Sequence, residues 1–72
     1  MDARALIAEI LRRDAVTSPD NTRLSEIDGW DSLKGVRLVL RLEELGGRAL
    51  SEDDIEGLQL VGDVDRILRA GS

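Results

Sequence analysis

The stretch GWDSLKG, residues 29–35, contains the side chains best suited to chemistry. Asp31 and Ser32 stand there directly before the most apolar run of the chain. We expect Ser32 at the N-terminus of a helix, where unpaired backbone N–H groups and the helix dipole favour an anion. A phosphate ester on its hydroxyl would therefore be stabilised. Asp31 would disfavour that phosphate directly, but its charge could help a metal ion or the basic surface of a modifying enzyme to approach.

The same two residues also have a purely structural interpretation. Aspartate and serine are common N-cap residues, because their oxygens accept hydrogen bonds from the free N–H groups of a first helical turn. The dipeptide alone therefore does not separate a helix cap from a modified serine, and the rest of the sequence has to be considered.

The composition argues against several classes of function. The chain has no histidine and no cysteine, which removes the commonest general base, the commonest transition-metal ligand and any thiolate site. We therefore expect a protein that is not an enzyme, with no catalytic and no metal-ligating residues. The formal charge of -5 argues against nucleic acid, and no apolar run reaches the length of a membrane span or a signal-peptide core. The expected location is the cytoplasm.

The length and the residue types predict one small domain, residues 1–72. Hydrophobic residues make up 42% of the chain and charged residues 35%, a balance typical of globular proteins. Phe and Tyr are absent and there is one Trp, so the core has to be built from Leu, Ile, Val and Ala.

Two segments of the first half are distinguished by their apolar pattern. A helix is predicted from a cap at Asp2 to about Arg13, because apolar side chains recur there at spacings of three and four. Residues 14–31 lack this period and are predicted to form a long loop. Leu24 and Ile27 are expected to anchor that loop on the core.

A second helix is predicted over residues 32–45, ending at the pair Gly46-Gly47. Its apolar side chains spread around most of the circumference, so we expect it to be largely buried as the central element. One polar stripe remains on it, which consists of Lys34, Arg37, Arg41 and Glu44.

A short third helix is predicted from a cap at Ser51 to about Gly57, followed by a last helix from about Leu60. The chain end from Ala70 is expected to fray. Short amphipathic helices can bury their apolar sides only against one another, so the predicted fold is all-α, a small four-helix bundle with three main helices and one short third helix.

The chain resembles the acyl carrier and peptidyl carrier protein family over nearly its whole length, and most strongly from Leu24 to Leu68. The DSL motif that opens the family's second helix matches residues 31–33. Residues 50–55, LSEDDI, resemble the acidic start of its short third helix, and residues 60–64, LVGDV, resemble the start of its fourth. DSL alone is a weak motif, but its distance from VGDV in a chain of this length makes the combination specific.

The resemblance implies an acyl-carrier-like fold and a free-standing monomeric carrier that catalyses nothing. It implies a 4'-phosphopantetheine arm on Ser32, within the motif that includes Asp31 and Leu33, attached from coenzyme A by a phosphopantetheinyl transferase that uses Mg²⁺. The arm's thiol would bear acyl or aminoacyl groups as thioesters, which suits a chain without cysteine. The implied partners are a loading ligase or acyltransferase and a downstream synthase or transferase.

The charge of the second helix departs from the family's pattern. Carriers of fatty acid synthesis typically have an acidic second helix, whereas the exposed stripe here is basic. Because complementary charges govern encounter, we expect a dedicated pathway, such as polyketide, nonribosomal peptide or related specialised biosynthesis. The candidate partner-binding residues are Trp30, Leu33, Lys34, Val36, Arg37, Leu40 and Arg41.

These residues also have structural interpretations. Trp30 could pack in the core or over the start of the second helix, core burial is the expected role of Val36 and Leu40, and the basic stripe could simply be a solvated helix face. Gly35 could allow a close approach by the arm or a partner, or tight packing against the third helix. The rival function is an unmodified carrier-like helical adaptor that binds a partner through the second helix, with Ser32 only as a cap.

Overall fold

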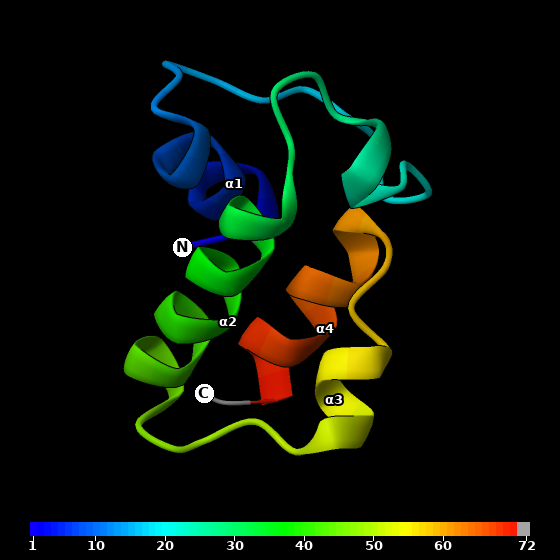
Figure 1. Cartoon of the computed structure of the whole chain (residues 1–72). Coiled ribbons are helices and arrows are strands. Elements are labelled where there is room, and N and C mark those ends of the chain that lie inside the picture. The colour runs from blue at the N-terminus through cyan, green and yellow to red at the C-terminus, as the bar shows by residue number, and fades with distance from the viewer. Residues whose placement is uncertain (71–72) are drawn as a thin grey trace.

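The computed structural model describes residues 1–70 and shows four α-helices, with no β-strand in that part of the chain (Figure 1). The predicted all-α bundle is therefore confirmed. The helices α1, α2 and α4 pack on one another, and in the view of Figure 1 α4 lies between α2 and the short α3. The helical elements are α1 Ala3–Leu11, a 3₁₀ turn Leu24–Glu26, α2 Ser32–Gly46, α3 Glu52–Glu56 and α4 Val61–Ala70.

The core is entirely aliphatic, as the composition predicts, and α1 contributes most to it. No polar or charged residue is buried within residues 1–70. Trp30 packs against the core from its edge and is half-buried. The buried core residues are Ala3, Leu6, Ile7, Ile10, Leu24, Ile27, Leu38, Leu42, Val61 and Val64.

The helix α1 begins where predicted and ends earlier. The carboxylate of Asp2 caps it by accepting from the N–H of Ala5 at 2.8 Å. Arg12 then takes a left-handed backbone conformation with φ 56°, and the N–H of Arg13 donates to the carbonyl of Ala8 at 2.9 Å. This pattern terminates a helix, so the predicted extension to Arg13 is wrong by two residues.

The long loop is held down by its two predicted anchors, because Leu24 and Ile27 are both buried in the core. The backbone of the loop also pairs with the segment that leads into α4. The N–H of Leu24 donates to the carbonyl of Gln59 at 2.9 Å, and the N–H of Val61 donates to the carbonyl of Thr22 at 3.0 Å. These bonds tie the loop that precedes α2 to the start of α4.

At the starts of α3 and α4, the two helices of the second half of the chain, side chains accept hydrogen bonds from backbone N–H groups. Ser51 and Asp54 form a reciprocal capping box at α3, which ends at Glu56 with Gly57 as its C-cap, in agreement with the predicted end near Gly57. Asp63 accepts from the N–H groups of Leu60 at 2.8 Å and Gln59 at 3.1 Å, so it organises the approach to α4. Burial raises the pKa of Asp63, but these backbone hydrogen bonds outweigh that effect and lower the pKa below its usual value.

The helix α4 starts at Val61, one residue after the predicted start, and extends to Ala70. Fraying was expected from Ala70 onward, but Ala70 still belongs to the helix, and residues 71–72 lie outside the described part. Across residues 1–70, no helix has both the length and the apolar character needed to cross a membrane.

Candidate functional site

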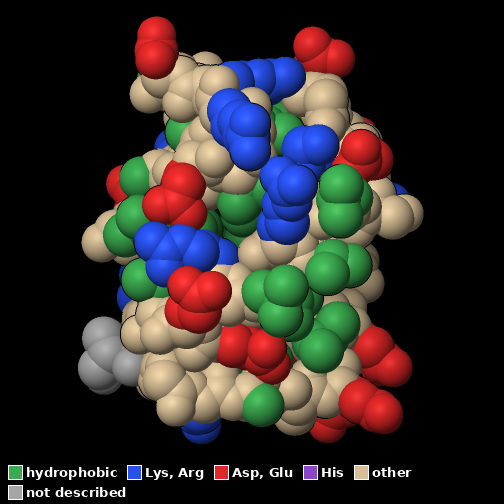
Figure 2. Space-filling model, turned by 60° about the vertical axis from the view of Figure 1, so that its left-hand side comes forward, with side chains coloured by type: hydrophobic (Ala, Val, Ile, Leu, Met, Phe, Trp, Pro, Cys, Tyr) green, Lys and Arg blue, Asp and Glu red, His purple; other side chains and the backbone are tan. Residues whose placement is uncertain are grey.

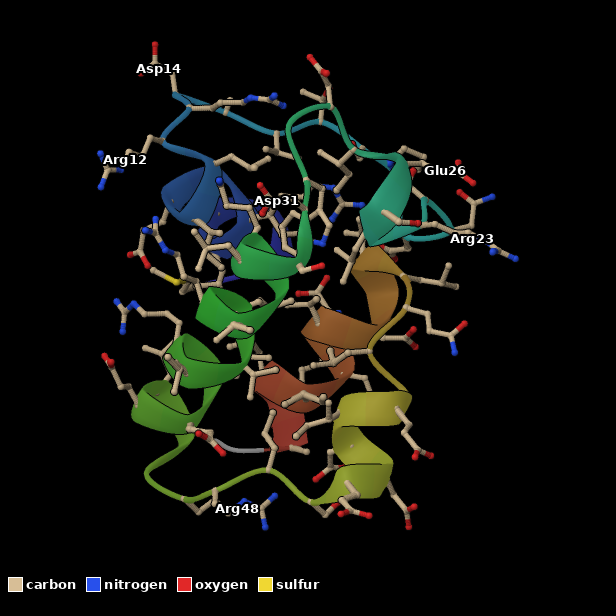
Figure 3. All side chains as sticks on the ribbon, viewed as in Figure 1. Arg12, Asp14, Arg23, Glu26, Asp31 and Arg48 are labelled. Atoms are coloured by element: carbon tan, nitrogen blue, oxygen red, sulfur yellow. The ribbon has the colours of Figure 1, made fainter. Side chains whose placement is uncertain are left out.

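The two polar residues of the GWDSL stretch have different roles at the start of α2. A turn at Gly29, with φ 87°, leads the chain into the site. Asp31 is the N-cap, and its carboxylate accepts from the N–H of Lys34 at 2.9 Å (Figure 3). Ser32 is the first residue of the helix, is exposed, and its hydroxyl has no hydrogen-bond partner in the described part of the chain. The interpretation in which Ser32 caps α2 is therefore wrong, because Asp31 performs that role.

The charge of Asp31 is stabilised by its surroundings. The backbone N–H of Lys34 donates to the carboxylate and holds the pKa of Asp31 below its usual value, and the Lys34 ammonium lies 3.7 Å from the second carboxylate oxygen. Asp31 is consequently ionised at neutral pH. A free hydroxyl and a fixed negative charge thus stand side by side at the surface.

Three apolar side chains of α2 are exposed where the sequence predicted a buried helix. Leu33 is 54% exposed, Val36 56% and Leu40 54%. The expected core burial of Val36 and Leu40 is therefore wrong. The reason is that α2 packs on α1 and α4 through Leu38 and Leu42, while the short α3 has no buried residue and leaves the opposite side of α2 open.

We call Leu33, Val36 and Leu40, together with Ile55 of α3, the apolar face. Figure 2 shows hydrophobic side chains gathered on this side of the molecule, with Lys and Arg side chains above them and Asp and Glu side chains below. Its three α2 residues are among the candidate partner contacts. Ile55 joins them at the surface, because the first-turn side of α3 packs loosely and leaves this side chain 42% exposed, although its place in an apolar pattern predicts an inward position.

An apolar pocket of about 440 Å³ opens between α2 and the α3 region, and Ser32 lies on its rim. The sequence did not predict this pocket, because its walls come from segments far apart in the chain. Apart from Ser32, every residue that lines it is hydrophobic or glycine. The lining residues are Leu24, Trp30, Ser32, Gly35, Val36, Leu38, Val39, Leu40, Ile55 and Leu58.

Trp30 and Gly35 have simple structural explanations at this pocket. Trp30 packs against the core with part of its surface and lines the pocket with another part, so the structural role expected of it is present. A Cβ atom added at Gly35 would meet no other atom within 4 Å. Tight packing of Gly35 against the third helix, one of its two interpretations, is therefore wrong.

The predicted basic stripe is divided by ion pairs. The guanidinium of Arg41 is held by Glu9 of α1, with Nε 2.7 Å from the carboxylate, and by Glu44 at 3.4 Å. The hydrogen bond between Arg41 and Glu9 lowers the pKa of Glu9 and raises the pKa of Arg41. The guanidinium of Arg37, by contrast, has neither a hydrogen bond nor an ion pair with any residue of the described chain.

These features define a small helical bundle that presents a free hydroxyl at a helix N-terminus beside an apolar pocket. The chain is similar to an acyl carrier protein of Chlamydia caviae, with 38% identity over 63 residues, which cover 88% of this chain and 82% of that protein. No family model matches the chain, and no solved structure matches it at a significant level. The identity over this span places the chain in the acyl carrier protein family.

Membership in this family gives the chain a carrier role, since acyl carrier proteins hold and present groups and are not enzymes. Among residues 1–70, no group of three or more acidic side chains is arranged so that it could hold a metal ion.

Proposed function

We propose that Ser32 is the attachment point of a 4'-phosphopantetheine arm, on which the chain holds acyl or aminoacyl groups as thioesters and delivers them to partner enzymes. The observation that carries the proposal is the exposed Ser32 hydroxyl, which is free of hydrogen bonds to described residues because Asp31 caps α2 in its place. This serine occupies the position of the serine in the family's DSL motif.

The residues present fit this group. The Ser32 oxygen would become the ester oxygen of the phosphate, its proton would be released, and the adenosine bisphosphate part of coenzyme A would leave. A phosphodiester there lies at the positive end of a helix of 15 residues. When bound, the arm supplies the thiol that a chain without cysteine lacks.

The role of Asp31 follows from its position. It holds the first turn of α2 through the N–H of Lys34, and it leaves the serine hydroxyl free to react. Its negative charge stands next to that hydroxyl, where it would attract the basic surface or the Mg²⁺ ion of a transferase. Leu33, the third residue of the motif, is exposed beside them and offers the transferase an apolar contact.

The pocket beside Ser32 favours an acyl cargo. Its walls are hydrophobic, so an uncharged aliphatic group would gain from entering it, whereas the ammonium of an aminoacyl group would lose hydration there. The basic residues on α2 support a pathway other than fatty acid synthesis, in specialised biosynthesis of the polyketide or nonribosomal peptide kind. The partners are then a loading ligase or acyltransferase and a downstream synthase or transferase, with the carrier a cytoplasmic monomer.

Loading with coenzyme A tests the proposal. We expect a broad-specificity phosphopantetheinyl transferase to add one phosphopantetheine mass to the chain, as measured by intact-protein mass spectrometry. The variant Ser32→Ala should gain nothing, because it lacks the nucleophilic oxygen. Ser25→Ala, which removes another exposed serine, should be loaded like the natural chain.

The decisive negative result is an unmodified natural chain in a reaction where the same transferase loads another carrier protein. Circular dichroism of Ser32→Ala should match the natural chain, since Ser32 makes no side-chain hydrogen bond to a described residue. An unmodified chain that still binds a partner through α2 would instead be the helical adaptor of the rival interpretation.

A further inference from the structure

The chain enters the Ser32 site through a short exposed turn. Ile27 is buried and Trp30 is half-buried, but Asp28 and Gly29 between them are exposed. The N–H of Trp30 donates to the carbonyl of Ile27 at 3.0 Å and closes the turn. Within residues 1–70, neither Asp28 nor Gly29 donates its own N–H to another residue. A backbone with so few internal hydrogen bonds needs contacts from outside the turn to keep one conformation.

Arg13, just beyond the end of α1, supplies such contacts. Its guanidinium donates to the carbonyl of Asp28, and one guanidinium nitrogen lies 3.7 Å from the carboxylate of the same residue. A Cβ atom at Gly29 would lie 3.0 Å from that guanidinium and 3.9 Å from a methyl group of Leu11. The side chain of Arg13 therefore bridges α1 and the turn that leads into α2.

The end of α1 determines where Arg13 lies. The left-handed residue Arg12 terminates the helix, and the N–H of Arg13 donates to the carbonyl of Ala8 at 2.9 Å, which fixes its backbone on the bundle. An arginine suits this place because its guanidinium is planar, always charged and carries several donors. The bond to the Asp28 carbonyl matters more than the ion pair, since the Asp28 carboxylate is fully exposed and water screens its charge.

We propose that Arg13 is a positioning residue for the attachment of the 4'-phosphopantetheine arm. By holding the turn at residues 28–29, it keeps Trp30, Asp31 and Ser32 in the arrangement that a transferase has to bind. Without this contact the turn adopts more conformations, and the transferase has to order it on binding. The inference rests on the proposed function, because it concerns the enzyme that modifies Ser32.

Loading kinetics of the full chain with coenzyme A and a broad-specificity phosphopantetheinyl transferase test the inference. We expect Arg13→Ala to raise the KM for the carrier about fivefold and to leave kcat within about twofold, because Ser32 and Asp31 are unchanged once bound. Arg13→Lys should recover part of the loss, since it retains a charged donor. Asp28→Asn should raise KM much less than Arg13→Ala, because it keeps the carbonyl and removes only an exposed charge.

Arg12→Ala is the matched control. It removes the same charge from the neighbouring residue, whose guanidinium projects from the bundle and has no partner among residues 1–70 (Figure 3). It should not raise KM. A transferase with a basic docking surface would bind either variant more readily on charge alone, so a loss confined to Arg13→Ala is not an effect of charge.

The unmodified chain provides a second readout. Trp30 is the one tryptophan of the sequence, so tryptophan fluorescence reports on the residue that follows the turn. We expect Arg13→Ala to increase the quenching of Trp30 by acrylamide and to speed hydrogen exchange of the Trp30 amide about fivefold. The circular dichroism spectrum should stay that of the natural chain, since the helices do not depend on this contact. Should Arg13→Ala lose its helical spectrum, Arg13→Gln, which keeps more of the side-chain stem, takes the same tests.

Equal KM values for the natural chain and Arg13→Ala would overturn the inference. An equal rise in KM for Arg12→Ala, or unchanged quenching and exchange of Trp30 in Arg13→Ala, would overturn it as well. A natural chain that is not loaded at all removes the carrier function and this inference with it. A chain that is loaded equally well without the Arg13 guanidinium keeps its carrier function and loses only the role of Arg13.

Discussion

At the scale of single residues, the start of α2 shows a division of roles between Asp31 and Ser32. A serine that caps a helix directs its oxygen to the backbone N–H groups of the first turn. Here Asp31 accepts that hydrogen bond, so the serine oxygen remains at the surface with no described partner. The aspartate of the motif thus has a structural reason for its place that is independent of any partner enzyme.

The cap makes a prediction about pH. The N–H of Lys34 lowers the pKa of Asp31 in the folded state relative to the unfolded chain. The ionised cap therefore stabilises the fold above the ordinary aspartate pKa, and this contribution is lost as the pH falls through the lowered value. We expect Asp31→Ala to lower Tm at neutral pH, by a difference that shrinks in acid.

Thermal unfolding followed by circular dichroism over a pH series measures this effect. Asp14→Ala is the control, because Asp14 is an exposed loop residue whose side chain has no described partner. It should leave Tm near that of the natural chain at every pH. A Tm difference for Asp31→Ala that stays constant from neutral to acidic pH would show that the charge of the cap contributes nothing.

At the scale of elements, α2 has two apolar sides, one buried and the other exposed to solvent. Leu38 and Leu42 face α1 and α4 and are almost completely buried, whereas Leu33, Val36 and Leu40 project where α3 provides no cover. A helix of five residues, such as α3, cannot cover a helix of 15 residues. The short α3 therefore creates both the pocket beside Ser32 and the apolar face.

Two leucines two positions apart on α2 should respond very differently to truncation. Leu38 is 1% exposed, so Leu38→Ala leaves a cavity and is expected to lower the free energy of unfolding by about 2–5 kcal/mol. Leu40→Ala is expected to change it by about 0.5 kcal/mol or less, because Leu40 is mostly in water. Urea unfolding measures both values, and similar losses would contradict the packing described for α2.

At the scale of the whole molecule, the loop before α2 and the start of α4 hold each other in place. The N–H of Gly62 donates to the carbonyl of Asp20 at 2.9 Å, next to the bonds that join Leu24 with Gln59 and Val61 with Thr22. This backbone pairing fixes the loop that ends in the Asp31-Ser32 site. The VGDV segment therefore supports the site from the other half of the chain.

The close approach at Gly62 leads to a further prediction. A Cβ atom there would lie 3.2 Å from the carbonyl oxygen of Asp20, so Gly62→Ala has to push the loop away. We expect the free energy of unfolding to fall by about 1–3 kcal/mol in urea denaturation, with faster hydrogen exchange at the Leu24 and Val61 amides.

Gly46→Ala is the matched control for Gly62→Ala. Gly46 is the last residue of α2, and a Cβ atom there meets nothing within 4 Å. Alanine also has the higher helix propensity, so this variant should be as stable as the natural chain or more stable by up to about 1 kcal/mol. Equal effects of the two alanines would show that the contact with Asp20 is not a constraint.

Much of the fold was predictable from the sequence because its signals are local. The period of the aliphatic residues predicts four helices in their order, and capping residues such as Asp2 and Ser51 mark where helices begin. The exposed serine at the start of the second helix was expected on the same grounds, since a helix N-terminus depends on only a few neighbouring residues.

The features that could not be predicted all depend on contacts between distant segments. Periodicity shows that α2 is apolar on several sides, but which side is buried depends on how α1, α4 and the short α3 pack against it. Likewise, the partner of Arg41 is Glu9, 32 residues earlier in the chain, so ion pairing within the basic stripe cannot be predicted from the stripe alone. Burial and pairing are settled by the neighbours that packing brings together, and sequence distance carries little information about them.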